Sequence, residues 1–247
     1  MYLKTRALVL RTTDYNDRDT LLTLLTPQHG KITAKVRGLR RKNNPMSAAC
    51  QILTCCEFTL FEYGSFYTVN EAVPTASFPG LQKDLCKLSL GTYFAQVAEL
   101  LSQEDIPNPE LLSLILNCLH VLSQDSQPEQ KVKAVFELRC ACLSGYMPDL
   151  RRCHQCQKEK VDYFDLSAGH LDCFDCRMET DSGIRLPISS GVLEAMRYIV
   201  YCDAKKLFSF TVGDDALIQL SQITEAYLTT QLERGFSTLD FYKSLLI

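Results

Sequence analysis

The chain lacks any apolar run long enough to enter or cross a membrane. Residues 1–20 contain no stretch that a signal peptide needs, because arginines flank the apolar run 7–10 on both sides. The most apolar later segment, 111–122, is broken by Asn117 and His120 and is shorter than the roughly 20 residues of a membrane span. We therefore expect a soluble, cytoplasmic protein with no membrane partner. Its 247 residues are 46% hydrophobic, which is enough for a folded core.

Signatures of common catalytic sites are also missing. A zinc deaminase needs an H-x-E element, but the four histidines are followed two places later by Lys31, Leu122, Cys156 and Asp172. The G-x-x-x-x-G-K-[ST] loop of ATP-binding proteins does not occur, and no nucleophile elbow can be recognised. We expect no catalytic residues, and therefore a protein that is not an enzyme.

Negative charge is absent from one stretch, residues 31–42, in which every charged residue is basic. Residues 31–37 alternate strictly, so a strand would bury Ile32, Ala34 and Val36 and turn the intervening side chains outward. The candidate nucleic-acid-binding residues of this stretch are Lys31, Lys35, Arg37, Arg40, Arg41 and Lys42. A cationic strand that continues into a loop can follow the phosphates of a single strand. The alternative is that these lysines and arginines only solvate a surface strand and its loop.

The net charge of -3 conceals an asymmetry between the two ends of the chain. Residues 1–80 carry ten Lys and Arg against six Asp and Glu, a balance of +4, whereas the remainder carries sixteen against twenty-three, a balance of -7. A basic N-terminal part attracts a polyanion, while an acidic remainder leaves its surface for proteins or solvent.

Four of the twelve cysteines form two C-x2-C pairs separated by sixteen residues: Cys153, Cys156, Cys173 and Cys176. This spacing predicts one zinc ion held by four thiolates, which leaves no open position for water and makes the site structural. Four free or oxidised thiols are the alternative. The other eight cysteines lie in apolar patterns without redox spacing, so we expect them to be small buried hydrophobes.

The order of elements indicates an α+β protein with four parts. Five strand-like runs at 4–12, 20–26, 31–37, 55–63 and 66–73 favour a five-stranded OB-type barrel over residues 1–80, with an SH3-like barrel or a small sandwich as alternatives. Helical periodicity then predicts the first part of a helical domain over 81–150, followed by the zinc module at 151–178 and the second helical part at 179–247. Ser190 can cap one helix of the second part, and Asp214 or Asp215 the last one.

Aromatic residues of the predicted barrel have two possible roles. In a strand over 55–63, Phe61 and Tyr63 share one face and Phe58 and Leu60 the other. An exposed pair would stack nucleic-acid bases, whereas a buried pair would fill the barrel, and the pattern leaves this open.

Taken together, the residues 8–12, 24–31, 36–41, 136–139 and 145–150 and the cysteine quartet resemble the bacterial RecO family of DNA repair proteins. The most specific parts are the Gly-Lys to Gly-x-Arg-Arg stretch and the Gly-Tyr-x-Pro-x-Leu segment before Cys153. Two departures are the Ala168-Gly169-His170 before the third cysteine and the Asn43-Asn44-Pro45 after the basic run. The last 60 residues read as generic helix.

The resemblance implies an oligonucleotide-binding barrel, zinc, binding to single- and double-stranded DNA, and strand annealing without ATP. It also implies RecR and single-stranded DNA-binding protein as partners, so that RecA is loaded during repair. Its zinc ligands fall on the cysteine quartet, and its basic DNA-binding face falls on Arg11, Lys31, Lys35, Arg37, Arg40 and Arg41. The rival hypothesis is a zinc-stabilised helical adaptor that docks other proteins without contacting DNA. Cations tucked inward or paired with acids would contradict the DNA-binding hypothesis.

Overall fold

The computed structural model describes residues 1–42, 44–64, 66–177 and 183–246. Ser65, at the tip of a predicted hairpin, and Met178, the last residue of the predicted zinc module, lie outside the described residues. The chain divides into two compact units, Met1–Asp125 with Phe236–Ile247, and Ser126–Gly235. The four-part division drawn from the sequence stays a prediction. Among the described residues no helix has the length and apolar character needed to cross a membrane.

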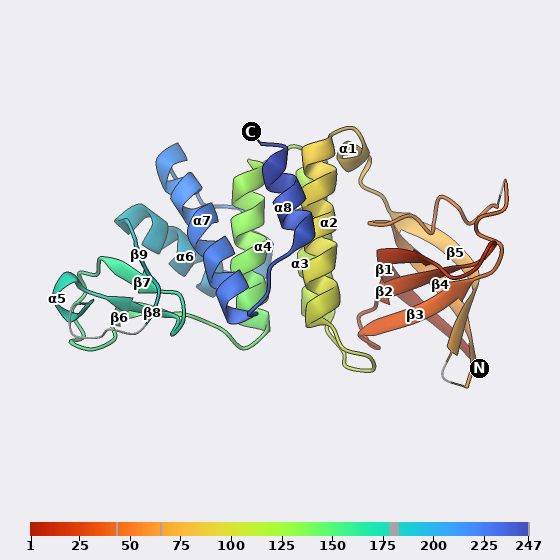
Figure 1. Ribbon diagram of the computed structural model, residues 1–247, viewed down its shortest axis with the longest axis horizontal. Helices are drawn as coiled ribbons and strands as arrows, with labels where there is room; N and C mark the ends of the chain where they lie inside the picture. The colour runs from red at the N-terminus through yellow and green to blue at the C-terminus, as the bar shows by residue number, and fades with distance from the viewer. Residues whose placement is uncertain (43, 65, 178–182, 247) are drawn as a thin grey trace. The chain divides into compact units, whose positions relative to one another are not determined.

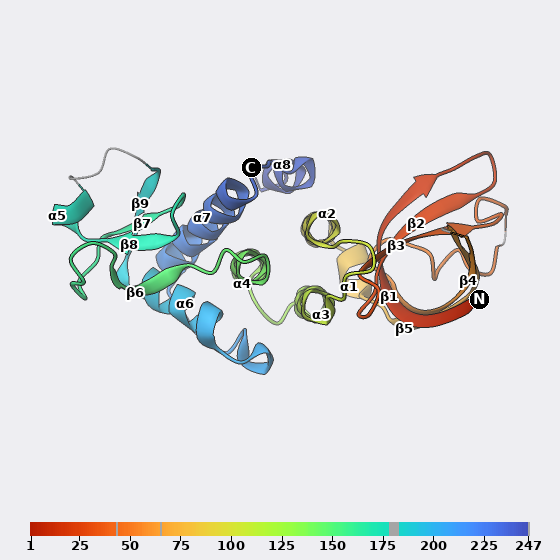
Figure 2. The same cartoon turned by 90° about the horizontal axis from the view of Figure 1, so that it is seen from below.

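The first unit begins with a closed barrel of five strands (Figure 1). These are β1 (Tyr2–Asp14), β2 (Thr20–Leu25), β3 (Lys31–Val36), β4 (Cys55–Tyr63) and β5 (Phe66–Ala76). They follow the order β1-β2-β3-β5-β4, and among the described pairings of these five strands only β3–β5 is parallel. Figure 2 shows the strands curving round the barrel, which the pairing of β1 with β4 closes. The predicted OB-type barrel is therefore confirmed.

Alternation along the strands fills the barrel. Ile32, Ala34 and Val36 of β3 are buried together with Phe58 and Leu60 of β4, and all five belong to one apolar cluster. Because successive side chains of a strand point to opposite faces, the residues between them lie on the outer surface. The face expected to be cationic is therefore the outer face of β3.

Three helices follow the barrel in this unit, and the chain returns to it with a fourth. They are α1 (Pro79–Gln82), α2 (Leu85–Leu101), α3 (Pro109–Ser123) and α8 (Ser237–Ser244). Asp84 caps α2 by accepting hydrogen bonds from the N–H groups of Cys86 and Lys87. The helix α8 packs on α2, where the rings of Tyr93 and Phe236 lie 5.5 Å apart. The sequence did not predict α8.

The second unit combines three long helices with a small sheet (Figure 1). The helices are α4 (Glu129–Leu143), α6 (Ser190–Tyr201) and α7 (Asp214–Gln231), with the short α5 (Phe174–Arg177) and the 3-10 turn η1 (Ala204–Lys206). The sheet has the order β6-β8-β7-β9, with β6 (Asp149–Cys153), β7 (Tyr163–Asp165), β8 (His170–Asp172) and β9 (Arg185–Pro187).

Helix starts in this unit differ from the predicted caps by one residue. Ser189 occupies the N-cap position of α6, so Ser190 is already helical. Gly213 occupies the N-cap position of α7, and Asp214 and Asp215 lie in its first turn. There the two carboxylates favour the helix through its dipole and not as caps.

Candidate nucleic-acid interface and metal centre

Two lysines lie on the outer face of β3, and both have partners. The Lys35 ammonium lies 2.9 Å from a carboxylate oxygen of Asp19 and 4.8 Å from the centre of the Tyr15 ring. Lys31 donates to the backbone oxygen of Glu99 at 3.1 Å. The cationic strand predicted from the sequence is present, but neither ammonium group is free.

Gly30 explains why Lys31 lies against α2. Its φ of +56° is in the left-handed region, and a Cβ at this position would come 2.1 Å from the backbone oxygen of Gln103. The next residue, Lys31, donates its backbone N–H to the same oxygen at 2.9 Å. Only glycine permits this close approach, and it places the Lys31 side chain beside the C-terminal end of α2.

The loop that follows β3 holds the cations without acidic partners. Arg37, Arg41 and Lys42 are exposed, and none has an ion pair within the part of the chain that the structure describes. Arg40 differs, since its guanidinium lies 3.4 Å from the Asp14 carboxylate. Gly38 begins the loop with a φ of +64°. We use the name free cation group for the three exposed cations that have no ion pair among the described residues, Arg37, Arg41 and Lys42.

Arg11 is held more firmly than the other candidates. Its guanidinium makes a bidentate contact with the Glu99 carboxylate, with nitrogen–oxygen distances of 2.8 to 3.0 Å. Planar paired hydrogen bonds of this kind are the stronger class of ion pair. Of the seven candidate residues, Arg11, Lys31, Lys35 and Arg40 are therefore engaged within the protein, and the free cation group is left.

Asp19 links the loop before β2 to the basic strand. One carboxylate oxygen accepts the backbone N–H of Gly38 at 2.9 Å, while the other lies beside Lys35 and accepts from the Asn16 side chain. The Lys35 ammonium, with these two further donors, holds the pKa of the Asp19 carboxyl well below its usual range. The segment 14–19 contains Asp14, Asp17 and Asp19 against the single cation Arg18. Its contact with β3 could not be read from the sequence, because residues 20–30 separate them.

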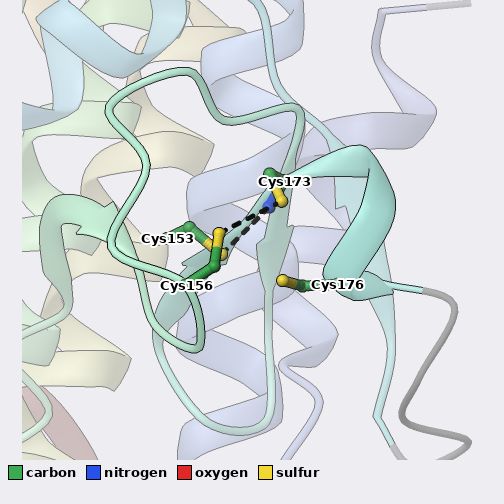
Figure 3. A group of neighbouring side chains, drawn as sticks. All are labelled: Cys153, Cys156, Cys173 and Cys176. Atoms are coloured by element: carbon green, nitrogen blue, oxygen red, sulfur yellow. Dashed lines mark hydrogen bonds between the residues drawn. The ribbon is translucent and has the colours of Figure 1, made fainter.

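The four predicted metal ligands come together in the second unit. Their sulfur atoms all lie within 4.8 Å of one another, in the only such group of cysteine, histidine or acidic side chains found among the described residues. Figure 3 shows Cys153 and Cys156 on one side of the group and Cys173 and Cys176 on the other, with the sulfurs turned toward a common centre. Cys153 ends β6, Cys173 follows β8, and Cys176 lies in α5.

The surroundings of the sulfurs fit a metal ion. Burial raises the pKa of the Cys153 thiol, but backbone N–H groups, including those of Cys156 and Cys173, outweigh it and hold the pKa at about 6. The backbone N–H of Cys173 points at the Cys153 sulfur from 3.4 Å (Figure 3). Burial and the neighbouring sulfurs raise the pKa of Cys176. The four thiols lie close together, and the lowered pKa of Cys153 favours its thiolate form. A metal cation would offset the negative charge of such thiolates, so the site fits a metal ion.

Most of the cations near the cysteine cluster form ion pairs or ring contacts with other residues. Five cations lie close to the cysteines in the sequence, Arg151, Arg152, Lys158, Lys160 and Arg177. Arg151 pairs with Asp149, Arg152 with Glu159, and Arg177 lies over the Tyr163 ring. Lys158 pairs with Asp175 at 2.9 Å, and the nearby Cys156 and Cys173 contribute to raising its pKa. His154 and His170 stack on each other at 4.3 Å and do not join the ligand group.

Comparison with known proteins identifies the family. A family model described as Recombination protein O N terminal matches residues 1–78, and a second, described as Recombination protein O C terminal, matches residues 82–240. The second match alone covers more than half of the chain. The chain belongs to the Recombination protein O (RecO) family. The resemblance drawn from the sequence is confirmed.

Curated relatives of this RecO chain match it almost from end to end. The DNA repair protein RecO of Acetivibrio thermocellus is 34% identical over 247 residues, which cover 99% of this chain and 97% of the relative. The proteins of the same name from Alkaliphilus metalliredigens and Caldicellulosiruptor saccharolyticus are 27% and 26% identical, and each match covers at least 98% of both chains. The RecO N-terminal match ends two residues after β5, so it coincides with the barrel, and the C-terminal match contains the cysteine cluster.

Proposed function

We propose that this protein is a DNA-binding recombination mediator that binds single- and double-stranded DNA, anneals single strands without ATP, and acts with RecR and single-stranded DNA-binding protein in loading RecA. We further propose that it works in the cytoplasm and is not an enzyme. The observation that carries the DNA-binding part is the free cation group, exposed on a loop of an OB-type barrel and without acidic partners among the described residues. Membership of a family whose relatives are named DNA repair proteins supports the rest.

The barrel positions these cations in the way that polynucleotide binding requires. OB-type barrels bind oligonucleotides over the face of their second and third strands and with the loops between strands 1 and 2 and between strands 4 and 5. The cationic side chains here lie on β3 and on the loop that leaves it. Because phosphate attraction depends on net local charge, the free cation group provides the first contacts. Lys35 and Arg40 exchange an acidic partner for a phosphate when DNA is bound.

The metal in this proposal is one structural zinc ion. Cys153, Cys156, Cys173 and Cys176 would hold it, since four thiolate sulfurs are the ligand set of closed structural zinc sites. With all four positions taken by protein, the ion supplies folding free energy and no reaction chemistry. The N–H groups that point at the sulfurs keep the ligands oriented.

Titration of labelled single-stranded DNA at several salt concentrations tests the proposal. Three phosphate contacts from the free cation group predict a log–log slope of about -2 in affinity against salt, and five contacts a slope near -3.5. The variant R37E/R41E/K42E should lose binding while keeping its helical circular dichroism. As a matched control, K83E/K205E/K206E reverses three exposed lysines that also lack ion pairs among the described residues, and it should bind normally.

The rival function is a zinc-stabilised helical adaptor that docks proteins without contacting DNA. It gains support from the four candidate cations that are already engaged inside the protein. Equal DNA affinity of the two triple variants would favour the adaptor and contradict the DNA-binding proposal.

A further inference from the structure

Four large aromatic side chains are exposed on the strands β1, β4 and β5 of the barrel. The exposed fractions are 63% for Tyr2, 40% for Phe61, 79% for Tyr63 and 75% for Phe66. Single exposed aromatics are ordinary on protein surfaces, but a cluster of them implies a partner that covers it. The inward-facing neighbour Leu60 is fully buried, so the barrel core is filled without these four rings.

Strand pairing brings the four rings together. Tyr2 of β1 is paired with Phe61 of β4, and Tyr63 at the end of β4 is paired with Phe66 at the start of β5. The Tyr2 and Phe61 rings touch edge to face, with centres 5.2 Å apart. Since Phe61 and Tyr63 are two residues apart on one strand, their side chains lie on the same outer face. We call this cluster the aromatic ledge, Tyr2, Phe61, Tyr63 and Phe66.

The aromatic ledge continues into the cationic strand. Phe61 is paired with Thr68 of β5, and Thr68 is paired in turn with Lys35 of β3. Directly paired residues of neighbouring strands point to the same face, and adjacent strands are about 4.8 Å apart. Phe61 and Lys35 therefore lie in one row across the outside of the barrel, about 10 Å from each other. On the other side of the ledge from Lys35, the Lys4 ammonium lies 2.7 Å from the Glu57 carboxylate and offsets its negative charge.

This row has the two chemistries that a single-stranded nucleic acid needs. Cations attract its phosphates, and flat apolar rings cover its unpaired bases. A protein partner would bury the rings as well, but it would not need them in register with Lys35 on a face that runs into the free cation group. The continuity with the cations therefore favours a polynucleotide as the occupant of the ledge.

We propose that the aromatic ledge stacks the bases of single-stranded DNA whose phosphates follow Lys35 and the free cation group. This inference rests on the proposed DNA-binding function and adds a second, uncharged part to the same site. Duplex DNA keeps its bases stacked inside the helix, so the ledge selects the single strand.

An abasic oligonucleotide separates stacking from charge. It carries the same phosphates as a thymidine oligonucleotide of equal length but offers no bases. The variant Y63A/F66A should bind the thymidine oligonucleotide more weakly by at least about 5-fold and by up to about 150-fold per ring lost. Its affinity for the abasic oligonucleotide should equal that of the unaltered protein. Because both side chains are exposed, the thermal midpoint should change little, and Y201A, which removes an exposed aromatic from α6, should alter neither affinity.

Conservative variants distinguish a stacked base from a merely apolar contact. Y63L/F66L keeps apolar area without aromatic faces and should behave like the alanine variant, whereas F66W should bind normally. Since the chain has no tryptophan, F66W is also a single reporter whose fluorescence the thymidine oligonucleotide should quench and the abasic one should not.

The outcomes separate this inference from the function on which it rests. If the unaltered protein binds neither oligonucleotide, the DNA-binding proposal fails. If it binds both equally, and Y63A/F66A does too, the ledge does not stack bases while the cationic interface stands. Normal DNA binding by Y63L/F66L, with weakened binding by Y63A/F66A, would likewise overturn base stacking and leave a merely apolar contact between the ledge and the DNA.

Discussion

At the scale of single residues, Asp19 should limit how much of the proposed DNA-binding face is available to a polynucleotide. Its carboxylate holds Lys35, and the substitution Asp19→Asn removes that charge while keeping an oxygen for the Gly38 N–H. We expect Asp19→Asn to bind single-stranded DNA more tightly, by up to about 5-fold, because the substitution releases Lys35 from a partly exposed ion pair, which contributes little to stability. The salt slope should steepen by about 0.7 as Lys35 gains a phosphate. Fluorescence anisotropy at several salt concentrations measures both quantities.

The pH dependence of this gain follows from the direction of the Asp19 pKa shift. The folded protein lowers the pKa of the Asp19 carboxyl below its ordinary value of about 3.9. The carboxylate is therefore charged at every pH above that value, and it is protonated only when the pH falls through the lowered pKa. The gain should thus be equal at pH 6 and pH 8. Asp17→Asn, which neutralises an exposed acid in the same loop without an ion pair among the described residues, is the control. A gain of equal size in Asp17→Asn would show that net charge, and not release of Lys35, is responsible.

A second residue-scale feature is the buried ion pair between α4 and α7. The Lys133 ammonium lies 3.0 Å from the Glu137 carboxylate and 2.8 Å from that of Glu225. Glu137 is fully buried and also accepts a hydrogen bond from the Thr224 hydroxyl at 2.9 Å. We expect Lys133→Met to lower the free energy of unfolding by about 3–5 kcal/mol, because it strands a buried carboxylate. Urea denaturation measures the loss, and the double variant K133M/E137L should recover much of it.

The loss in Lys133→Met should depend on pH in one direction. Burial already raises the pKa of Glu137 against the pull of Lys133, and removing the lysine raises it further. Between the unfolded value near 4.3 and the higher folded one, the folded state binds more protons, so stability falls as pH rises through this window. The deficit relative to the unaltered protein should consequently be smaller at pH 5 than at pH 8. A deficit that grows toward pH 5 would contradict this account.

Residue identities were easier to predict than residue partners. The cysteine quartet was predictable because metal-ligand spacing is local within each pair, and one hairpin joins the two pairs. The inward and outward residues of β3 followed from strict alternation. The partners of Arg11 and Lys31 were not predictable, since both contact Glu99, which is 88 and 68 residues away in the chain. Whether all seven candidate residues bind nucleic acid stays a prediction.

At the scale of elements, we expect the small sheet of the second unit to depend on the zinc ion proposed for the cysteine cluster. The strands β7, β8 and β9 have three residues each, too few to bury a substantial core. Treatment with a strong chelator should release one zinc ion per chain and make four additional thiols reactive. After removal of the metal, the backbone amides of β6 to β8 should lose their protection from hydrogen exchange first. The helical circular dichroism should be largely unchanged. A metal-binding dye and thiol titration give the two stoichiometries.

Single cysteine variants provide the matched comparison. Cys173→Ser should abolish stoichiometric zinc binding, because three thiolates and a hydroxyl make a weaker set. Cys202→Ser removes a half-buried cysteine outside the cluster and should retain one zinc. Retention of zinc by Cys173→Ser would place the metal elsewhere.

Elements were predictable where their own pattern was strong. The helix α2 shows clear apolar spacing behind the capping residue Asp84, and β3 alternates cleanly. By contrast, α8 is eight residues long, buries only Leu239 and Tyr242, and is held by packing on α2 from far along the sequence. The strand β9 has three residues and no alternation. Such elements exist because of tertiary contacts, which local periodicity does not record.

At the scale of the whole molecule, two opposite charges are kept on different parts of one chain. Residues 1–80 carry the positive excess, although the chain as a whole has a net charge of -3 and an isoelectric point near 5.8. Screening at physiological salt confines electrostatic attraction to about 8 Å. A polyanion therefore responds to the local charge of the barrel, while an ion exchanger that contacts any surface also responds to the acidic remainder.

Because the two charges are separated, the protein should be retained both by a positively charged resin and by a negatively charged one. At pH 7.5 and low salt it should bind an anion exchanger through its acidic remainder and heparin, a polyanion, through its barrel. Because each reversal of a lysine or arginine lowers the charge by two, R37E/R41E/K42E and K83E/K205E/K206E both change the net charge from -3 to -9. Both should therefore elute later from the anion exchanger. Only the first should lose retention on heparin, because heparin responds to where the cations lie and not to their number. Equal loss of heparin retention in both variants would mean that net charge governs polyanion binding, and the barrel would then have no special part in it.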